Sequence, residues 1–190
     1  MGDAISPGAT IVALAYMEHL ELCRIPKDVR DRFQCMRYMD DLLAIWKDEE
    51  GNGATKAIDT MKYESPLTLE DTHDPNFLET HIEIKDRRLT FRLKNVNEDG
   101  DRKVWRYAAR WLDGAPFNVK RGLLLSSLRK VHAYASDETQ LCKSAIAKLK
   151  EFSKAGYPRG VLLYMCNVVY TSTQVRTWRY LATTYIPTYL

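Results

Sequence analysis

The chain of 190 residues contains little cysteine, glycine or proline, and it has no long hydrophobic run. Its four cysteines are scattered without a Cys-x-x-Cys pair, so neither a disulfide framework nor a zinc knuckle is indicated. Nine glycines and seven prolines exclude collagen-like and linker-like sequences. The longest apolar stretches, residues 8–17 and 160–165, are too short to cross a bilayer. These absences predict a protein without a membrane segment in a reducing, intracellular compartment.

The composition supplies enough apolar material for a core, with 45% hydrophobic and 28% charged residues. A chain of this length buries roughly 70% of its unfolded surface when it folds. The net charge of +3 hides an uneven distribution. Residues 1–100 hold 13 Lys and Arg against 20 Asp and Glu, whereas residues 101–190 hold 15 against 5. This division suggests an acidic site beside a basic surface for a polyanion; the alternative is a surface that is uneven by chance.

The first hundred residues show helix and hairpin patterns. Ser6 as N-cap and Pro7 at the first helical position predict a helix over 7–22. Two apolar runs, 33–39 and 42–46, flank Asp40-Asp41 and predict a β-hairpin with the carboxylates at its tip. Between and after these elements we expect a connection over 24–30, a short helix over 54–61, an edge strand over 67–69, and a second hairpin of 77–85 paired with 88–95. The alternation in this second hairpin predicts one core face and one wet face.

The second half is expected to be mainly helical. Apolar spacing predicts helices over 119–135 and from Ser136, as N-cap, to a stop at Gly156 and Pro158, and residues 159–190 are expected to be helical. The polar segment 95–102 marks the change in composition, so we divide the chain into regions 1–98 and 99–190. The fold class is α+β.

The string Tyr38-Met39-Asp40-Asp41 carries the clearest chemical signal. Adjacent carboxylates repel each other, and a bound divalent cation is the usual relief. Hard cations such as Mg²⁺ take oxygen ligands, so a magnesium site at Asp40 and Asp41 is the simplest account. The alternative is a solvated Asp-Asp turn.

Tyr38 to Asp41 between two strands resembles the catalytic hairpin of reverse transcriptases. The segment Gly2-Asp3-Ala4-Ile5-Ser6-Pro7 resembles the family's Gly-x-x-x-Ser-Pro element. Phe77-Leu78-Glu79 resembles the primer-grip segment, where Phe-Leu-Gly or Phe-Leu-Asp is more usual. Residues 122–129, and then Gly156-Tyr157-Pro158, resemble the region after the palm in reverse transcriptases of Penelope-like and related non-LTR elements.

This resemblance implies a partial palm, an antiparallel sheet with helices on one face, followed by a helical thumb-like segment. It implies RNA-templated DNA synthesis with Mg²⁺, an RNA template, a DNA primer and deoxynucleoside triphosphates. By family position, Asp40 and Asp41 would be the catalytic metal ligands, and Tyr38 and Met39 neighbours of the primer end. Gly2, Ser6 and Pro7 would belong to the nucleotide and template pocket.

The family's third metal-binding carboxylate lies upstream of the Gly-x-x-x-Ser-Pro element, together with the fingers. The resemblance therefore implies an amino-terminally incomplete enzyme that needs a separate palm and fingers segment as partner. Catalysis by this polypeptide alone is not expected. The alternatives are a non-catalytic, nucleic-acid-binding scaffold derived from a reverse transcriptase, and a remnant fragment.

Basic residues in the second half are candidates for phosphate contacts that do not depend on nucleotide sequence. They are Arg129 and Lys130, with Lys120 and Arg121 nearby, and the residues Lys143, Lys150 and Lys154 on one face of a predicted helix. The alternative for each is a solvated helix face.

Overall fold

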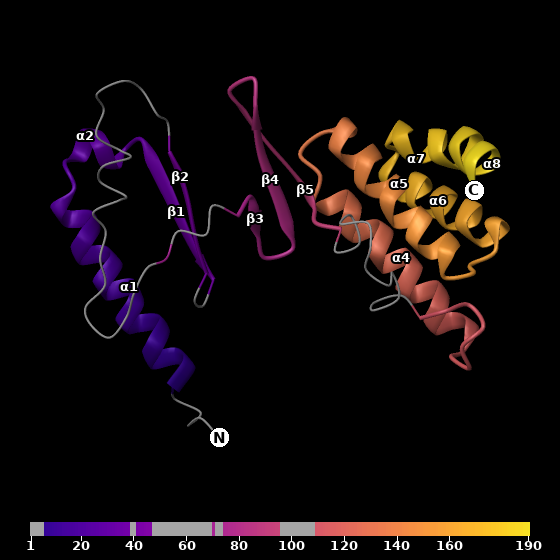
Figure 1. Ribbon diagram of the computed structural model, residues 1–190, viewed down its shortest axis with the longest axis horizontal. Helices are drawn as coiled ribbons and strands as arrows, with labels where there is room; N and C mark the ends of the chain where they lie inside the picture. The colour runs from indigo at the N-terminus through magenta and orange to yellow at the C-terminus, as the bar shows by residue number, and fades with distance from the viewer. Residues whose placement is uncertain (1–5, 39–40, 47–69, 71–73, 96–108) are drawn as a thin grey trace. The chain divides into compact units, whose positions relative to one another are not determined.

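The computed structural model describes residues 6–38, 41–46, 70, 74–95 and 109–190 (Figure 1). They form helices and two antiparallel sheets, which confirms the α+β class. The chain divides into two compact units, Met1–Asp74 and Pro75–Leu190, whereas the change in composition suggested a division at residue 98. The second hairpin therefore belongs with the carboxyl-terminal helices. The first unit holds 8 Lys and Arg against 15 Asp and Glu, and the second holds 20 against 10, so the units differ sharply in charge.

The first unit begins with a long helix, α1 (Ser6–Arg24), close to the predicted range. The segment expected to be a connection instead contains a short helix, α2 (Lys27–Arg30). Pro26 initiates it, because the Pro26 carbonyl accepts hydrogen bonds from the backbone N–H groups of Val29 and Arg30 at 3.0 and 2.9 Å. A proline before a helix loses no intrahelical hydrogen bond, so it marks the start of α2. The helix expected over 54–61 and the edge strand over 67–69 lie outside the described residues.

Two strands complete the described part of the first unit. Strands β1 (Phe33–Tyr38) and β2 (Asp41–Trp46) pair in antiparallel register, from Phe33 opposite Trp46 to Tyr38 opposite Asp41. The predicted first hairpin is thus confirmed. The two residues between the strands are Met39 and Asp40, which lie outside the described residues.

The second unit opens with three strands, β3 (Asn76–Phe77), β4 (Thr80–Lys85) and β5 (Arg88–Leu93). A single strand over 77–85 was expected, but the chain turns at Leu78 and Glu79, and Phe77 pairs with Thr80. Leu78 has φ 55°, a left-handed conformation that alternation of apolar residues does not reveal. The pairing of β4 with β5 confirms the second hairpin.

Helices form the rest of the second unit. They are α4 (Phe117–Ala133), α5 (Glu138–Lys154), α6 (Arg159–Thr173), α7 (Arg176–Tyr180), the π-helical segment η1 (Leu181–Tyr185) and α8 (Ile186–Tyr189). Their apolar faces enclose one core, in which Leu124, Leu128, Leu149, Phe152, Leu162 and Trp178 are fully buried. Among the described residues, no helix combines the length and hydrophobicity needed to cross a membrane.

The stop predicted at Gly156 and Pro158 is confirmed. Gly156 has φ 86°, which favours glycine, and its N–H donates to the Ser153 carbonyl at 2.9 Å. Pro158 then occupies the N-cap position of α6. The chain therefore reverses direction sharply between α5 and α6.

The β4–β5 hairpin is joined to the helices at Phe91. The Ser136 N–H donates to the Phe91 carbonyl at 2.9 Å, and the Phe91 N–H donates to the Ser136 hydroxyl at 3.1 Å. Leu93, at the end of β5, is buried in the helical core. An exposed ion pair joins Lys130 of α4 to Glu79 in the β3–β4 turn. Together these contacts hold the end of the hairpin that includes Leu93.

Asp137, and not Ser136 as expected, is the N-cap of α5. The Asp137 carboxylate accepts a hydrogen bond from the Gln140 N–H at 2.9 Å, and the Ser136 hydroxyl donates to the same carboxylate at 2.9 Å. The Ser136 hydroxyl accepts a hydrogen bond from the Phe91 N–H, so the neighbouring residue, Asp137, caps the helix. The hydrogen bond from Gln140 lowers the pKa of Asp137 below its ordinary value of 3.8.

This cap predicts a pH-dependent stability. Asp137→Ala should lower the free energy of unfolding by about 1 kcal/mol at pH 7. Because the folded-state pKa is lowered, the charged cap stabilises the fold above the ordinary pKa and loses this effect as the pH falls through the folded value. Urea denaturation should therefore show the difference between wild type and variant shrinking below about pH 4. Asp137→Asn, which keeps a neutral acceptor, is the control; an alanine effect that stays constant down to pH 2 would contradict the assignment.

Candidate functional site

Tyr38 and Asp41 lie side by side on one face of the first hairpin. They are cross-strand partners, and such partners project their side chains to the same face. Both are exposed, Tyr38 to 53%, and Met36 on the same face is exposed to 54%. The structure thus brings together the first and last residues of the Tyr-x-Asp-Asp string on an accessible surface.

Helix α1 is tied to the opposite face of this hairpin. Arg37, next to Tyr38, forms an ion pair with Glu18, and the two side chains are only 13% and 18% exposed. Cys35 lies on the same face, where burial raises the pKa of its thiol and the nearby Glu18 carboxylate adds to the effect. The ion pair therefore orients the strand that carries Tyr38.

The burial of this ion pair predicts a measurable coupling. A double-mutant cycle with Glu18→Gln and Arg37→Gln should give a coupling energy of about 1–2 kcal/mol, because the charges are shielded from water. Urea denaturation gives the free energy of unfolding of each variant. The matched control is the pair Glu21–Arg24 on the same helix, whose arginine side chain is 72% exposed. This control should couple by about 0.5 kcal/mol or less, and equal coupling in the two cycles would refute the orienting role of Arg37.

Of the two carboxylates expected to hold magnesium, the structure describes only that of Asp41. The Asp41 carboxylate is exposed, and no side chain that the structure describes hydrogen-bonds or ion-pairs with it. Its oxygens are of the type that Mg²⁺ prefers. Asp40 lies outside the described residues, and among those described no three His, Cys, Asp or Glu side chains gather as a metal site. Asp41 is therefore suited to be one ligand among others.

The other residues predicted to line the nucleotide and template pocket are described only in part. Ser6 and Pro7 form the first turn of α1, while Gly2 and Met39 lie outside the described residues. The predicted phosphate-binding residues belong to the other unit.

Lys143, Lys150 and Lys154 are all exposed on α5, where spacings of seven and four residues place them on one face. We call these three residues the α5 lysine stripe. Arg129 on α4 is also exposed. Lys130 is partly engaged, because it pairs with Glu79 and lies 5.8 Å from the Tyr134 ring centre.

Lys120 corrects one expectation. It is only 6% exposed, and its ammonium group donates to the carbonyls of Trp111 and Asp113. It also lies 5.6 Å from the centre of the Trp111 ring. A lysine enclosed in this way stabilises the fold and is not available to a phosphate.

The end of the second hairpin was missed by sequence reasoning. A core face was expected there, but Ile84 is 70% exposed, Leu89 42% and Phe91 37%. Lys85 and Arg88 stand opposite each other next to the turn. The sequence feature that could have drawn attention to this end of the hairpin is its turn, Lys85-Asp86-Arg87-Arg88. This turn contains neither asparagine nor glycine, although two-residue hairpin turns strongly prefer them.

Comparison of the chain with protein-family models, with curated proteins and with solved structures gave no match in any of the three.

Proposed function

We propose that this chain is part of a reverse transcriptase that carries out RNA-templated DNA synthesis. One observation carries the proposal: Tyr38 and Asp41 are cross-strand partners on an exposed face, so the string Tyr-Met-Asp-Asp spans the junction of two paired strands. A pair of adjacent acids at such a junction is the arrangement that the family resemblance implies. The basic second unit adds a surface suited to a polyanion.

In this proposal the roles follow the family pattern. Asp40 and Asp41 hold Mg²⁺, and Tyr38 and Met39 flank the primer end. Gly2, Ser6 and Pro7 contribute to the pocket for the template base and the incoming nucleotide. Mg²⁺ held by these carboxylates would supply the positive charge that activates the primer 3′ hydroxyl and stabilises the leaving pyrophosphate. Two carboxylates on one hairpin supply only part of the ligand set, so a third must come from another segment.

The carboxylates predict a metal-dependent effect. Asp40→Asn and Asp41→Asn should each weaken Mn²⁺ binding by roughly tenfold or more, measured from the electron paramagnetic resonance signal of free Mn²⁺. Asp31→Asn, which removes an exposed acid elsewhere in the first unit, should leave the affinity unchanged. Equal affinities for all three variants and the wild type would contradict the metal assignment.

A primer-extension assay tests the reaction itself. The full chain is mixed with a polypeptide that carries a reverse-transcriptase palm strand and fingers, an RNA template, a DNA primer, deoxynucleoside triphosphates and Mg²⁺. Extension should require both polypeptides and should be abolished by Asp40→Asn or Asp41→Asn. Extension that survives both substitutions would refute the catalytic roles.

A second candidate function is a nucleic-acid-binding scaffold without catalysis. It is favoured by the second unit, which has its own core and ten more basic than acidic residues. A scaffold of this kind binds nucleic acid in the same way whether or not Asp41 is present. Binding without extension in the complemented assay would favour this candidate.

The α5 lysine stripe predicts a salt-dependent affinity. Replacing Lys143, Lys150 and Lys154 with Gln should reduce the slope of log affinity against log salt by about 2–3 for an RNA–DNA duplex, because fewer counterions are released. Fluorescence anisotropy at several salt concentrations measures the slope. Lys27→Gln with Arg32→Gln, two exposed cations of the first unit, is the control. An unchanged slope in the triple variant would mean that the stripe is merely solvated.

A further inference from the structure

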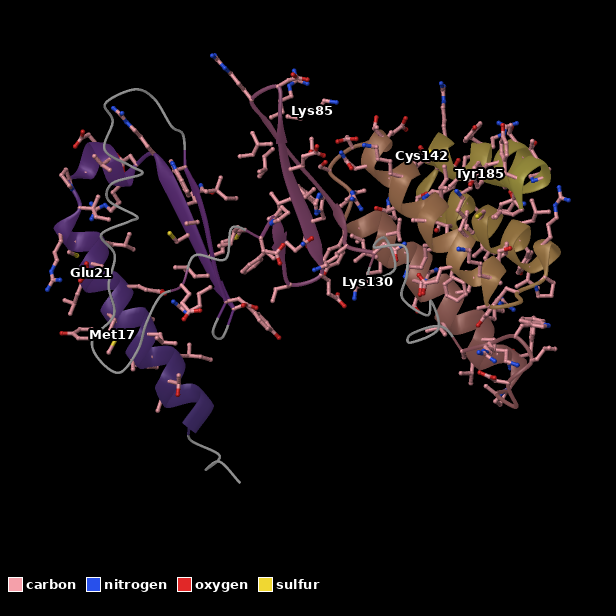
Figure 2. The ribbon with its side chains drawn as sticks, viewed as in Figure 1. Met17, Glu21, Lys85, Lys130, Cys142 and Tyr185 are labelled. Atoms are coloured by element: carbon pink, nitrogen blue, oxygen red, sulfur yellow. The ribbon has the colours of Figure 1, made fainter. Side chains whose placement is uncertain are left out.

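His19 and Cys23 form a pair of metal-ligating side chains on α1. They are four residues apart in the chain, so their side chains lie one turn apart on the same side of the helix. The His19 Nε2 atom lies 3.6 Å from the Cys23 Sγ atom, and both residues are exposed. Glu21, which lies between them in the chain and is labelled in Figure 2, pairs instead with Arg24. The imidazole and the thiol therefore meet each other at the surface of the first unit.

The distance between these two atoms is the one that a tetrahedral zinc ion requires. Zinc lies about 2.3 Å from a thiolate sulfur and about 2.0–2.1 Å from an imidazole nitrogen. With a tetrahedral angle of about 109° between the two bonds, the sulfur and the nitrogen are about 3.5–3.6 Å apart. The Cys23 Sγ and His19 Nε2 atoms already have this separation. They need move neither apart nor together to bind one ion.

The surroundings of the pair also favour a cation. The first unit holds 15 Asp and Glu against 8 Lys and Arg, and this excess of negative charge attracts positive ions. Both ligands are open to solvent, so an ion can reach them without a change of fold. The alternative is a hydrogen bond from the thiol to the imidazole that serves only the helix. A thiol is a weak donor, and such a pair at an exposed position adds little to stability.

We propose that His19 and Cys23 bind a divalent transition-metal ion of the zinc type. On binding, the Cys23 thiol loses its proton to solvent and its thiolate sulfur binds the ion, while the neutral His19 imidazole binds it through Nε2. These side chains supply two of the four positions around a tetrahedral ion. In the part of the chain that the structure describes, no third His, Cys, Asp or Glu gathers with them, so we assign the remaining positions to water.

The ligand types distinguish this site from the one proposed at Asp40 and Asp41. Thiolate and imidazole favour zinc and related transition metals, whereas carboxylate oxygens favour Mg²⁺. The new site therefore does not depend on the proposed polymerase. A search for paired cysteines does not reveal it, because the second ligand is a histidine.

The first test measures Co²⁺ binding by the full, reduced chain in the presence of millimolar Mg²⁺. A thiolate ligand gives Co²⁺ a charge-transfer absorption in the near ultraviolet that oxygen ligands do not give. This band should appear with the wild type, and Zn²⁺, which binds such sites more tightly than Co²⁺, should remove it. Cys23→Ser should abolish the band. His19→Gln should weaken Co²⁺ binding at least about tenfold, since the loss of a residue that merely orients a ligand costs about as much.

Two control variants test whether the position of the thiol matters. Cys23→Ser combined with Glu21→Cys keeps one thiol and His19 on α1, but residues two apart do not face each other on a helix. This variant should bind Co²⁺ as weakly as His19→Gln. Cys142→Ser removes a partly buried thiol from the other unit and should leave the titration unchanged.

A second measurement separates metal binding from folding. Because both positions are exposed, Cys23→Ser and His19→Gln should unfold at the same urea concentration as the wild type when no metal is present. Added Zn²⁺ should raise the midpoint of the wild type and should have no such effect on either variant, because a ligand of the folded state stabilises it.

Three results would overturn the proposal. They are equal Co²⁺ titrations of the wild type, Cys23→Ser and His19→Gln, wild-type affinity in the variant with Glu21→Cys, and the absence of any thiolate band. Asp41→Asn should leave the Co²⁺ band intact. A failure of the polymerase proposal and a failure of this one would therefore give different results.

Discussion

Two hydrogen bonds between Phe91 and Ser136 determine how the second unit is assembled. The outer edge of β5 would otherwise present unpaired backbone groups, and the link between α4 and α5 satisfies those of Phe91. The same serine donates to Asp137, the residue that caps α5, so the start of that helix and the position of the hairpin are fixed together. Leu93 then completes the attachment by entering the core. The positions of the α5 lysine stripe and of the hairpin turn both follow from this junction.

The two units differ in how much apolar surface they bury. The core of the second unit includes Trp178, Phe152 and the leucines of four helices, and the buried ammonium of Lys120 fastens the segment before α4 to it. In the described part of the first unit, the buried apolar residues are Leu14 and Val29. The Glu18–Arg37 ion pair therefore contributes a larger fraction of the stabilising interactions in the first unit than such a pair would in the second. Tyr38 and Asp41 belong to the small, acidic unit, whereas the phosphate-binding candidates belong to the larger, basic one.

Sequence reasoning predicted the elements whose signals are local. The first hairpin follows from the alternation of its residues, and α5 and its end follow from apolar spacing and from Gly156 placed shortly before Pro158. Sequence reasoning failed where a contact between residues far apart in the chain determines the local structure. The Ser136 hydroxyl accepts a hydrogen bond from the Phe91 N–H, and Asp137 caps α5 in its place. Sequence reasoning also failed at Leu78, where an apolar residue adopts a left-handed turn, and at Ile84, whose alternation indicated a core that the helices do not extend to cover. For the candidate site, the pairing of Tyr38 with Asp41 was predictable, whereas the engagement of Lys130 and the burial of Lys120 depend on tertiary packing.

The attachment of the β4–β5 hairpin at its base has a mechanical consequence. Six residues of strand extend about 20 Å from the junction, so the hairpin acts as a lever arm. A tilt of about 10° at Leu93 would carry the turn through roughly 3 Å. A small adjustment of the packing around α4 and α5 would therefore be enlarged at the turn.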